Sequence, residues 1–337
     1  MINLTVSKTN TGKNHYSSLT EAIAAIPADS AEPVTIFLSA GTYHEKVTIA
    51  RPFVTLIGED TDTTIITYDD CATQLMPDGS KRGTFRSYTM FLDGDDITLS
   101  NLTIRNAAFP RSKAGQALAL YADGDRIIVK NCRLESYQDT LFTGPLPPAP
   151  LSPGGFTGPK EFAQRIVGRQ YYTNCYICGD IDFIFGSAIA YFESCEIASV
   201  YSEELASDKD GNTPVYGYAT AASTPEGYPY GYVFHNCRFT GTVPDRSVYL
   251  GRPWRDYAKT VLLNCYLGSH IRQEGFHDWN KPNARENCFY AEYQSYGPGA
   301  VTDSSLRAPY VRQLTDAEAA LHAKEKVLGG NDGWFPA

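Results

Sequence analysis

The chain has 337 residues, of which 42% are hydrophobic and 20% are charged, and its formal net charge is −9. This composition suits a globular protein with a large core and excludes a disordered chain. The negative charge and the absence of a Lys/Arg run argue against nucleic acid or an anionic membrane as partners. No stretch approaches the ~18 to 20 consecutive apolar residues that a membrane-spanning helix needs.

The N-terminal region reads Met1-Ile-Asn-Leu-Thr-Val-Ser-Lys8, with neither the basic nor the apolar segment of an export signal. This predicts a cytoplasmic protein if Met1 is the native start, and a secreted one if the chain is a trimmed form. Ser18, followed three residues later by Glu21, resembles a capping box and predicts a helix that runs to Ile26.

A residue pair, Asn or Ser followed by Cys, recurs through the chain within β-rich segments. The pairs are Asn131-Cys132, Asn174-Cys175, Ser194-Cys195, Asn236-Cys237, Asn264-Cys265 and Asn287-Cys288, and Asn101-Leu102 takes the same place earlier. Recurrence at intervals of about 20 to 43 residues is typical of a solenoid, whose stacked coils supply the core together. We expect an all-β, single-stranded parallel β-helix that forms one domain over residues 1–337.

The cysteines have a simple place in such a solenoid, because equivalent residues of successive coils lie ~4.8 Å apart. The cysteines would form an internal stack, and the asparagines a hydrogen-bonded ladder at a turn. We expect reduced, buried thiols, with a bridge such as Cys175–Cys178 as the alternative. A metal site at this Cys-x-x-Cys pair is disfavoured, since no second pair or histidine cluster accompanies it.

The segment from Thr143 to Gln164 interrupts the repeat with six prolines and the pair Gly154-Gly155. It is predicted to be a loop insertion (143–164). Because it lies inside a coil and closely follows Gln138 and Asp139, we interpret it as the wall of a cleft and not as a domain linker.

Near the C-terminus, Thr315 and Glu318 repeat the capping-box pattern and predict a second helix toward Val327. Open solenoid ends expose sheet edges. We therefore interpret the two predicted helices as short caps at both ends of the solenoid.

Two aspartates share one position relative to the recurring pairs: Asp139 lies eight residues after Asn131, and Asp182 lies eight residues after Asn174. If these coils are neighbours and the proline-rich loop projects outward, the two carboxylates lie within ~5 Å of each other. Two carboxylates so close do not both ionise easily, so one pKa should rise and the other fall. The alternative is that each is a turn aspartate satisfied by backbone N–H groups.

Five sequence blocks, in this order, are similar to those of the pectin methylesterase (pectinesterase) family. They are Gly41-Thr-Tyr-His-Glu45, Gln116-Ala-Leu-Ala-Leu120, Gln138-Asp-Thr-Leu-Phe142, Asp182-Phe-Ile-Phe-Gly186 and Leu250-Gly-Arg-Pro-Trp254. The resemblance spans nearly the whole chain and implies a right-handed parallel β-helix with an open cleft along one face. We interpret the first block as structural.

The resemblance also implies roles for the matched residues. Asp182 would be the nucleophile that attacks the methyl ester of a galacturonate, and Asp139 would be the general acid and then the general base. The amides of Gln116 and Gln138 would stabilise the oxyanion. Arg252 would pair with Asp182 and keep it ionised.

Substrate-binding positions follow from the same blocks. Trp254 offers a flat surface for a sugar ring, with a core tryptophan as the alternative, and Arg252 and Gln116 would also touch the substrate. Thr84 and Phe85 match a substrate-contacting segment, and Phe185 is expected to line the cleft. Phe142, Tyr88 and the long loop depart from the family pattern, so subsite preferences are left open.

The six histidines show no metal-site or relay spacing, so we expect no metal and no cofactor. The expected partner is methyl-esterified homogalacturonan or oligogalacturonides, bound by a monomer that binds no nucleic acid and no membrane. A polygalacturonase or pectate lyase on a similar β-helix is one alternative. A non-catalytic carbohydrate-binding β-helix is the other.

Overall fold

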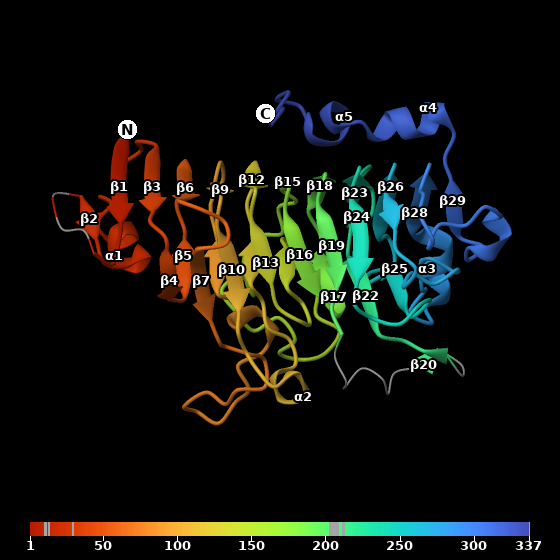
Figure 1. The fold of residues 1–337 in the computed structure, drawn as a ribbon, viewed down its shortest axis with the longest axis horizontal. Helices are drawn as coiled ribbons and strands as arrows, with labels where there is room; N and C mark the ends of the chain where they lie inside the picture. The colour runs from red at the N-terminus through yellow and green to blue at the C-terminus, as the bar shows by residue number, and fades with distance from the viewer. Residues whose placement is uncertain (10–11, 13, 29, 202–208, 211–212, 337) are drawn as a thin grey trace.

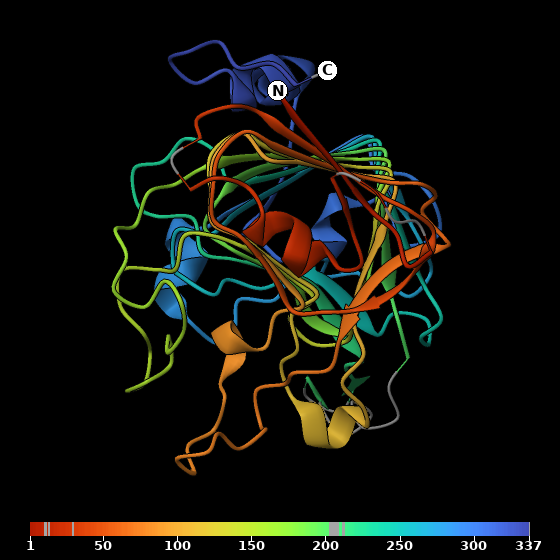
Figure 2. The same ribbon diagram turned by 90° about the vertical axis from the view of Figure 1, so that its left-hand side faces the viewer.

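The computed structural model describes residues 1–337 apart from 10–11, 13, 29, 202–208, 211–212 and 337. Three parallel sheets run side by side along one axis, and successive strands of each sheet come from successive coils (Figure 1). Seen along that axis, the coils superimpose in a roughly triangular cross-section (Figure 2). This is the single-stranded parallel β-helix that the repeats predict.

The first sheet has twelve strands and contains both ends of the solenoid. In spatial order its strands are β2 (His15–Tyr16), β1 (Ile2–Val6), β3 (Val34–Leu38), β6 (Val54–Gly58), β9 (Thr98–Ser100), β12 (Ile127–Lys130), β15 (Arg169–Thr173), β18 (Ile189–Glu193), β23 (Tyr232–His235), β26 (Lys259–Leu263), β28 (Phe289–Tyr293) and β29 (Val311–Gln313).

The second and third sheets complete each coil. The second sheet contains β27 (Tyr266–Leu267), β24 (Arg238–Gly241), β19 (Glu196–Ser199), β16 (Tyr176–Gly179), β13 (Arg133–Glu135), β10 (Thr103–Asn106), β7 (Thr64–Tyr68) and β4 (Gly41–His44). The third contains β25 (Val248–Gly251), β22 (Gly217–Ala222), β17 (Ile181–Gly186), β14 (Leu141–Thr143), β11 (Leu120–Ala122), β8 (Met90–Leu92) and β5 (Val47–Ile49). A separate antiparallel pair joins β20 (Lys209–Asp210) to β21 (Thr213–Pro214).

Helical segments are short and lie at the ends and in the loops. They are α1 (Leu19–Ala24), η1 (Thr84–Arg86), α2 (Arg111–Ala114), α3 (Pro282–Asn287), η3 (Ser304–Leu306), α4 (Asp316–Ala319), η4 (Ala320–His322) and α5 (Lys324–Leu328). Helix α1 packs against β1, β2 and β5 and so lies across the N-terminal opening of the solenoid (Figure 2), as predicted.

The second helix was predicted to be continuous and to cap the C-terminal end of the solenoid, and the structure differs on both points, because the helix is interrupted and α5 packs against β18 in the middle of the first sheet. Thr315 and Glu318 form the complete capping box, but the helix that they start ends after one turn of α4 and one of η4. Ala323 has an extended backbone (φ −62°, ψ 146°), and α5 begins only after it. The segment can therefore bend and follow the outside of the first sheet.

The turn between the first and second sheets explains the recurring Asn pairs. Its corner residue has a positive φ in successive coils, namely Asn101, Asn131, Asn174, Ser194, Asn236, Asn264 and Gln294, all between 51° and 57°. Asparagine tolerates this left-handed conformation better than most residues. The prediction for Asn287 is wrong, because Asn287 ends α3 and Gln294 takes the corner of that coil.

The predicted asparagine ladder is present only in part. Asn131 donates from Nδ2 to Asn101 Oδ1 at 3.2 Å, and no further amide-to-amide step occurs at these corners within the described residues. The corner at Ser194 has no amide side chain, so a continuous ladder cannot form there.

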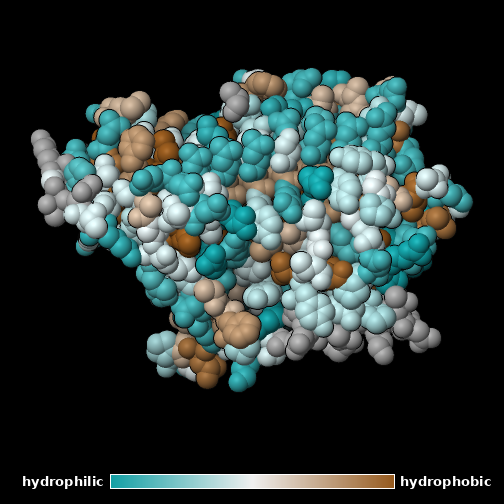
Figure 3. All heavy atoms as spheres, in the orientation of Figure 1, coloured by the Kyte–Doolittle hydropathy of each residue, from teal (hydrophilic) through white to brown (hydrophobic). Residues whose placement is uncertain are grey.

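The eight cysteines are all free and buried, as predicted. At the corner positions each thiol donates to backbone carbonyl oxygens of its own coil or the preceding one, for example Cys175 Sγ to Val129 O and Cys265 Sγ to Phe234 O, both at 3.3 Å. Aromatic rings continue the stacking inside the solenoid, where the centroid of Phe192 lies 4.7 Å from Tyr172 and 4.5 Å from Phe234. The face drawn in Figure 3 is predominantly hydrophilic, as expected for the outside of the coils.

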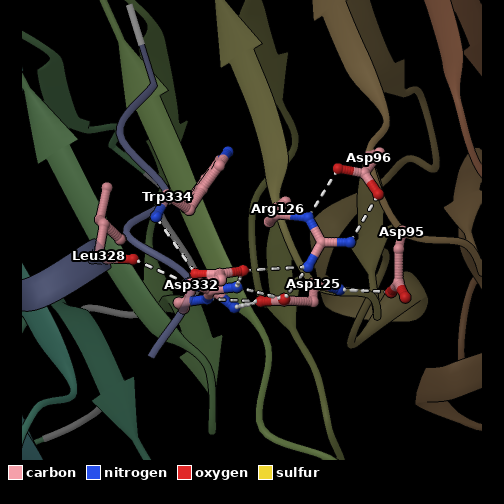
Figure 4. Close-up of polar contacts among 8 residues, drawn as sticks. Asp95, Asp96, Asp125, Arg126, Leu328, Asp332 and Trp334 are labelled. Atoms are coloured by element: carbon pink, nitrogen blue, oxygen red, sulfur yellow. Dashed lines mark hydrogen bonds and ion pairs between the residues drawn. The ribbon is translucent and has the colours of Figure 1, made fainter. Parts of the chain in front are cut away.

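The C-terminal segment runs back over the outer face of the first sheet (Figure 1) and is held there by ion pairs (Figure 4). Asp332 accepts from Arg169 at 2.5 Å and lies 3.6 Å from Arg126. Arg169 also binds the Asp125 carboxylate and the carbonyl oxygen of Leu328. Leu328 is fully buried in an apolar cluster against this sheet, so the segment covers a face that would otherwise be exposed.

Candidate active site

The two predicted aspartates lie on neighbouring coils of the third sheet. Strands β14 and β17 pair in register, with Leu141 opposite Ile184, and this offset places Asp139 opposite Asp182. The backbone N–H of Asp139 donates to the carbonyl oxygen of Ile181 at 3.1 Å. The registry predicted from the shared offset is therefore confirmed.

The local backbone turns both side chains away from the regular strand pattern. Asp139 has φ 66° and Asp182 has φ 49°, and the register between β17 and β22 shifts between Ile181 and Ile184. Such irregularities re-aim a side chain and are costly unless the surroundings hold them in place. The next residue, Phe183, is fully buried in the core, so strand β17 still packs against the core although the Asp182 side chain points outward.

Arg252 is paired with Asp182, as predicted. Nε donates to Oδ1 and Nη2 donates to Oδ2, both at 2.8 Å, and the two side chains are 14% and 11% exposed. The guanidinium also lies 3.8 Å from the ring centroid of Tyr218 and 3.8 Å from that of Trp279. Two parallel charge-assisted bonds and two aromatic contacts leave the guanidinium little freedom.

The electrostatics of the pair favour a proton on Asp139. Burial raises the pKa of Asp139 well above its ordinary value, and the neighbouring Asp182 carboxylate raises it further. The positive charges of Arg252 and Arg111 oppose this rise, and Asp180 adds to it. A carboxylic acid whose pKa is raised in this way keeps its proton to a higher pH than an ordinary aspartate and can donate it in a reaction.

The two predicted oxyanion donors stand side by side. Gln116 and Gln138 form a parallel β-bridge, and the N–H of Ala117 donates to the carbonyl oxygen of Gln138 at 3.1 Å. Both side chains are half-buried. Within the described residues neither side-chain amide has a hydrogen-bond partner, so both are available to a substrate oxygen.

An aromatic cluster adjoins the aspartates. Ring centroids of Phe142 and Phe185 are 4.9 Å apart, those of Phe85 and Phe142 are 5.0 Å apart, and those of Phe185 and Trp254 are 5.5 Å apart. Phe85 and Phe185 are only 2% and 4% exposed, so they form the floor of the cluster and have little ring surface that a ligand could contact. Trp254 is half-buried and has the larger accessible surface; Thr84, in η1, is half-buried as well.

The proline-rich insertion was predicted to begin at Thr143, but Thr143 is the last residue of β14. From Gly144 to Gln164 it forms a loop without helix or strand, as predicted, and it packs onto this cluster. Phe156 is 4% exposed, and its ring centroid lies 5.8 Å from that of Phe85 and 6.1 Å from that of Trp254. Arg165 donates to the carbonyl oxygens of Pro147, Lys160, Glu161 and Ala163, which holds the loop in one shape. Lys160 pairs with Asp93 at 2.5 Å. The insertion is therefore a fixed wall beside the candidate site.

Four further residues were not predicted from the sequence. Arg111 in α2 pairs with Asp180 at 2.7 Å, and the Asp180 side chain is fully buried. Tyr218 and Trp279 flank Arg252. Asp180 lies two residues before Asp182, and this closeness in the sequence could have indicated a place near the site. Arg111, Tyr218 and Trp279 share no sequence motif with the aspartates, so nothing in the sequence indicated them.

The block from Gly41 to Glu45 has the structural role that was expected. The Glu45 carboxylate accepts from the backbone N–H groups of Leu19 and Thr20 at 3.0 and 2.8 Å and so caps the first turn of α1. The buried hydroxyl of Tyr43 donates to the carbonyl oxygen of Ser39 at 2.9 Å.

Within the residues that the structure describes, no group of three or more His, Cys, Asp or Glu side chains is arranged to hold a metal ion. None of the helices in the described ranges is long and apolar enough to cross a membrane.

Comparison with known proteins places the chain in a family. The Pectinesterase family model matches residues 3–145 and 164–331, leaving out most of the insertion. Pectinesterase 31 of Arabidopsis thaliana is 33% identical over 316 residues, which cover 91% of this chain and 87% of that protein. The structure of pectin methylesterase PemA from Erwinia chrysanthemi matches with a TM-score of 0.80 and 33% identity over 100% of this chain and 99% of that one. A pectin methylesterase in complex with a hexasaccharide matches with the same values.

The fold and the site together define a β-helix enzyme that bears an acidic pair and an arginine on the outer face of one sheet. The chain belongs to the pectinesterase family, and it is therefore a carboxylic ester hydrolase.

Proposed function

We propose that this protein hydrolyses the C6 methyl esters of galacturonate residues in pectin or oligogalacturonides and releases methanol. The single observation that supports this most strongly is the in-register pair Asp139 and Asp182, with Arg252 bound bidentately to Asp182. The similarity to a pectin methylesterase that binds a hexasaccharide supports a polysaccharide or oligosaccharide substrate.

In the proposed reaction, an oxygen of the Asp182 carboxylate attacks the ester carbonyl carbon. The bond from that carbon to the methoxy oxygen breaks, and Asp139 gives its proton to the departing methanol. This leaves an anhydride between Asp182 and the galacturonate. Water then attacks the galacturonate carbonyl and gives a proton to Asp139, which restores both aspartates and releases the free acid.

The negative charge that develops on the carbonyl oxygen needs donors that are already in place. The amides of Gln116 and Gln138 are adjacent, half-buried and without partners among the described residues, so they suit this role. Removing one such donor from an oxyanion site typically raises the barrier by about 2.7 to 4 kcal/mol.

The substrate chain is proposed to lie along the third sheet, beside the insertion and the loops that carry Thr84 and α2. Trp254 would contact a sugar ring, while Phe85 and Phe185 support it from below. A methyl-esterified chain carries less negative charge than free polygalacturonate, so a protein of net charge −9 would repel it less.

The test is methanol release from highly esterified pectin by the wild-type protein and by Asp182→Asn. Asparagine keeps an oxygen acceptor for Arg252 but lacks the nucleophilic carboxylate, so turnover should fall by at least about 1,000-fold while the fold is kept, as judged by circular dichroism. Undiminished turnover would contradict the assignment of the nucleophile. New reducing ends or unsaturated products in place of methanol would indicate a glycosidase or a lyase.

A further inference from the structure

A buried ion pair lies beside the two aspartates and is not used in the reaction proposed above. Nε of Arg111 donates to Oδ2 of Asp180 at 2.7 Å; the Arg111 side chain is 12% exposed and that of Asp180 is not exposed at all. Asp180 Oδ1 also accepts from the backbone N–H of Ile181 at 2.6 Å. A pair this deep is held by its mutual attraction, and each member would be costly to leave alone.

The pair is connected to the active-site backbone on both sides. Ile181, whose N–H binds Asp180, accepts the hydrogen bond from the N–H of Asp139 through its carbonyl oxygen. Arg111 belongs to α2, which ends directly before Gly115 and Gln116. The ion pair therefore joins the segment that carries one oxyanion donor to the strand that carries Asp182.

We propose that Arg111 and Asp180 are a positioning pair for the acid/base: their opposite charges balance beside Asp139 and set the pH at which Asp139 loses its proton. This inference rests on the role proposed for Asp139. Neither residue touches the reacting atoms in the proposed reaction, so both act through Asp139.

The charges that face Asp139 come from four places. Asp182 is on β17, Asp180 directly precedes that strand, Arg252 follows β25, and Arg111 lies in α2. Burial causes the largest rise in the pKa of Asp139. The two aspartates raise this pKa further, and the two arginines lower it. Burial also raises the pKa of Asp180; Arg111 opposes that rise most strongly, and the backbone N–H of Ile181 opposes it as well.

Removing one member of the pair should therefore shift Asp139 in a direction that depends on which member is lost. Asp180→Asn leaves the Arg111 cation uncompensated, which favours ionised Asp139. Arg111→Gln leaves Asp180 without its partner. An ionised Asp180 would then raise the pKa of Asp139, and a protonated Asp180 would leave the pKa of Asp139 nearly unchanged. A single charge within ~10 Å at an effective dielectric constant of ~20 corresponds to a shift of about 1 pH unit.

The experiment is the pH dependence of kcat/KM for methanol release by the wild-type protein, by the single variants Asp180→Asn, Arg111→Gln and Arg111→Lys, and by the double variant that combines Asp180→Asn with Arg111→Gln. The basic limb should move about 1 pH unit lower in Asp180→Asn and should not move lower in Arg111→Gln. It should return close to the wild-type position in Arg111→Lys, which keeps the charge, and in the double variant, which removes both charges. Equal loss of activity across the pH range, with an unmoved limb in Asp180→Asn, would overturn the proposal.

A matched control separates this effect from a general loss of stability. Arg307 and Glu292 form an ion pair that is 1% and 2% exposed and involves β28 of the first sheet. Glu292→Gln should destabilise the fold and leave the basic limb in place, and a limb that moves equally in this control would also overturn the proposal.

Failure of the proposed function is distinguishable from failure of this inference. If the wild-type protein releases no methanol, the esterase proposal fails, and the titration of the Asp139 carboxyl group in the same variants can still be followed by carbon-13 NMR. A midpoint that is lower in Asp180→Asn than in the wild type supports the pair, and an unchanged midpoint refutes it.

Discussion

Arg252→Lys is the substitution for which the structure gives the most defined expectation. The arginine makes two parallel bonds of 2.8 Å to Asp182, and its guanidinium lies 3.8 Å from the ring centroids of Tyr218 and of Trp279. Lysine keeps the positive charge but can make only one of the two bonds, and it lacks the planar group that fits between the rings.

The size of the effect follows from the lost hydrogen bond. A hydrogen bond to a charged group contributes about 1.5 to 3 kcal/mol, and little of this is lost to solvent screening because both side chains are less than 15% exposed. At 1.36 kcal/mol for each factor of ten, kcat/KM should fall about 10- to 150-fold. The loss should appear mainly in kcat, since the bonds hold the attacking carboxylate and not the distant sugar rings.

The assay is steady-state methanol release from esterified pectin, with thermal unfolding measured in parallel. Arg312→Lys serves as the matched control, because Arg312 is an exposed arginine whose guanidinium lies 4.8 Å from the ring of Phe289, away from the aspartates. The control should stay within about twofold of the wild type. If Arg252→Lys did the same with an intact fold, the bidentate pairing would have no catalytic importance and the reasoning would be refuted.

Two further predictions concern Asp139 and the insertion. Because burial and Asp182 raise the pKa of Asp139, the folded chain keeps a proton that the unfolded chain releases above about pH 4, so this residue lowers stability as pH rises toward its folded pKa. Asp139→Asn should therefore abolish turnover yet raise the unfolding midpoint more at pH 7 than at pH 4, and an equal change at both pH values would contradict the shift. Phe156→Ala should raise KM for pectin about 2- to 10-fold, with a smaller change in kcat. This range corresponds to the loss of roughly one aromatic contact of ~0.5 to 1.5 kcal/mol, because the Phe156 ring packs against both Phe85 and Trp254. Phe162→Ala, at a position 94% exposed on the same loop, should leave KM unchanged, and an equal KM for both variants would refute a role for the packed ring.

The fold was largely predictable because a solenoid repeats its signals. Asn131, Asn174 and Asn264 mark the same corner in different coils, and the left-handed backbone found there is the physical reason for asparagine. The pattern failed at Asn287, where the same two letters end a helix, because a pair of residues carries no information about the backbone that surrounds it.

The C-terminal region shows a different limit. The capping box at Thr315 was visible in the sequence, but the break at Ala323 was not, since alanine favours helices. The apolar outer face of the first sheet and the ion pairs of Asp332 determine the path of this segment. Tertiary packing overrides the local preference there.

The sequence by itself determined the register of Asp139 against Asp182, because a parallel β-helix converts equal offsets from a corner into neighbouring positions in space. The sequence also predicted reduced cysteines, and the family resemblance predicted Arg252 as the partner of Asp182. Only the tertiary structure decided which further charges and rings surround the two aspartates. The bonds from Arg111 to Asp180 and from Arg169 to Asp332 span 69 and 163 residues. They depend on how loops and the terminal segment fold back over the coils, and no repeat in the sequence records those paths.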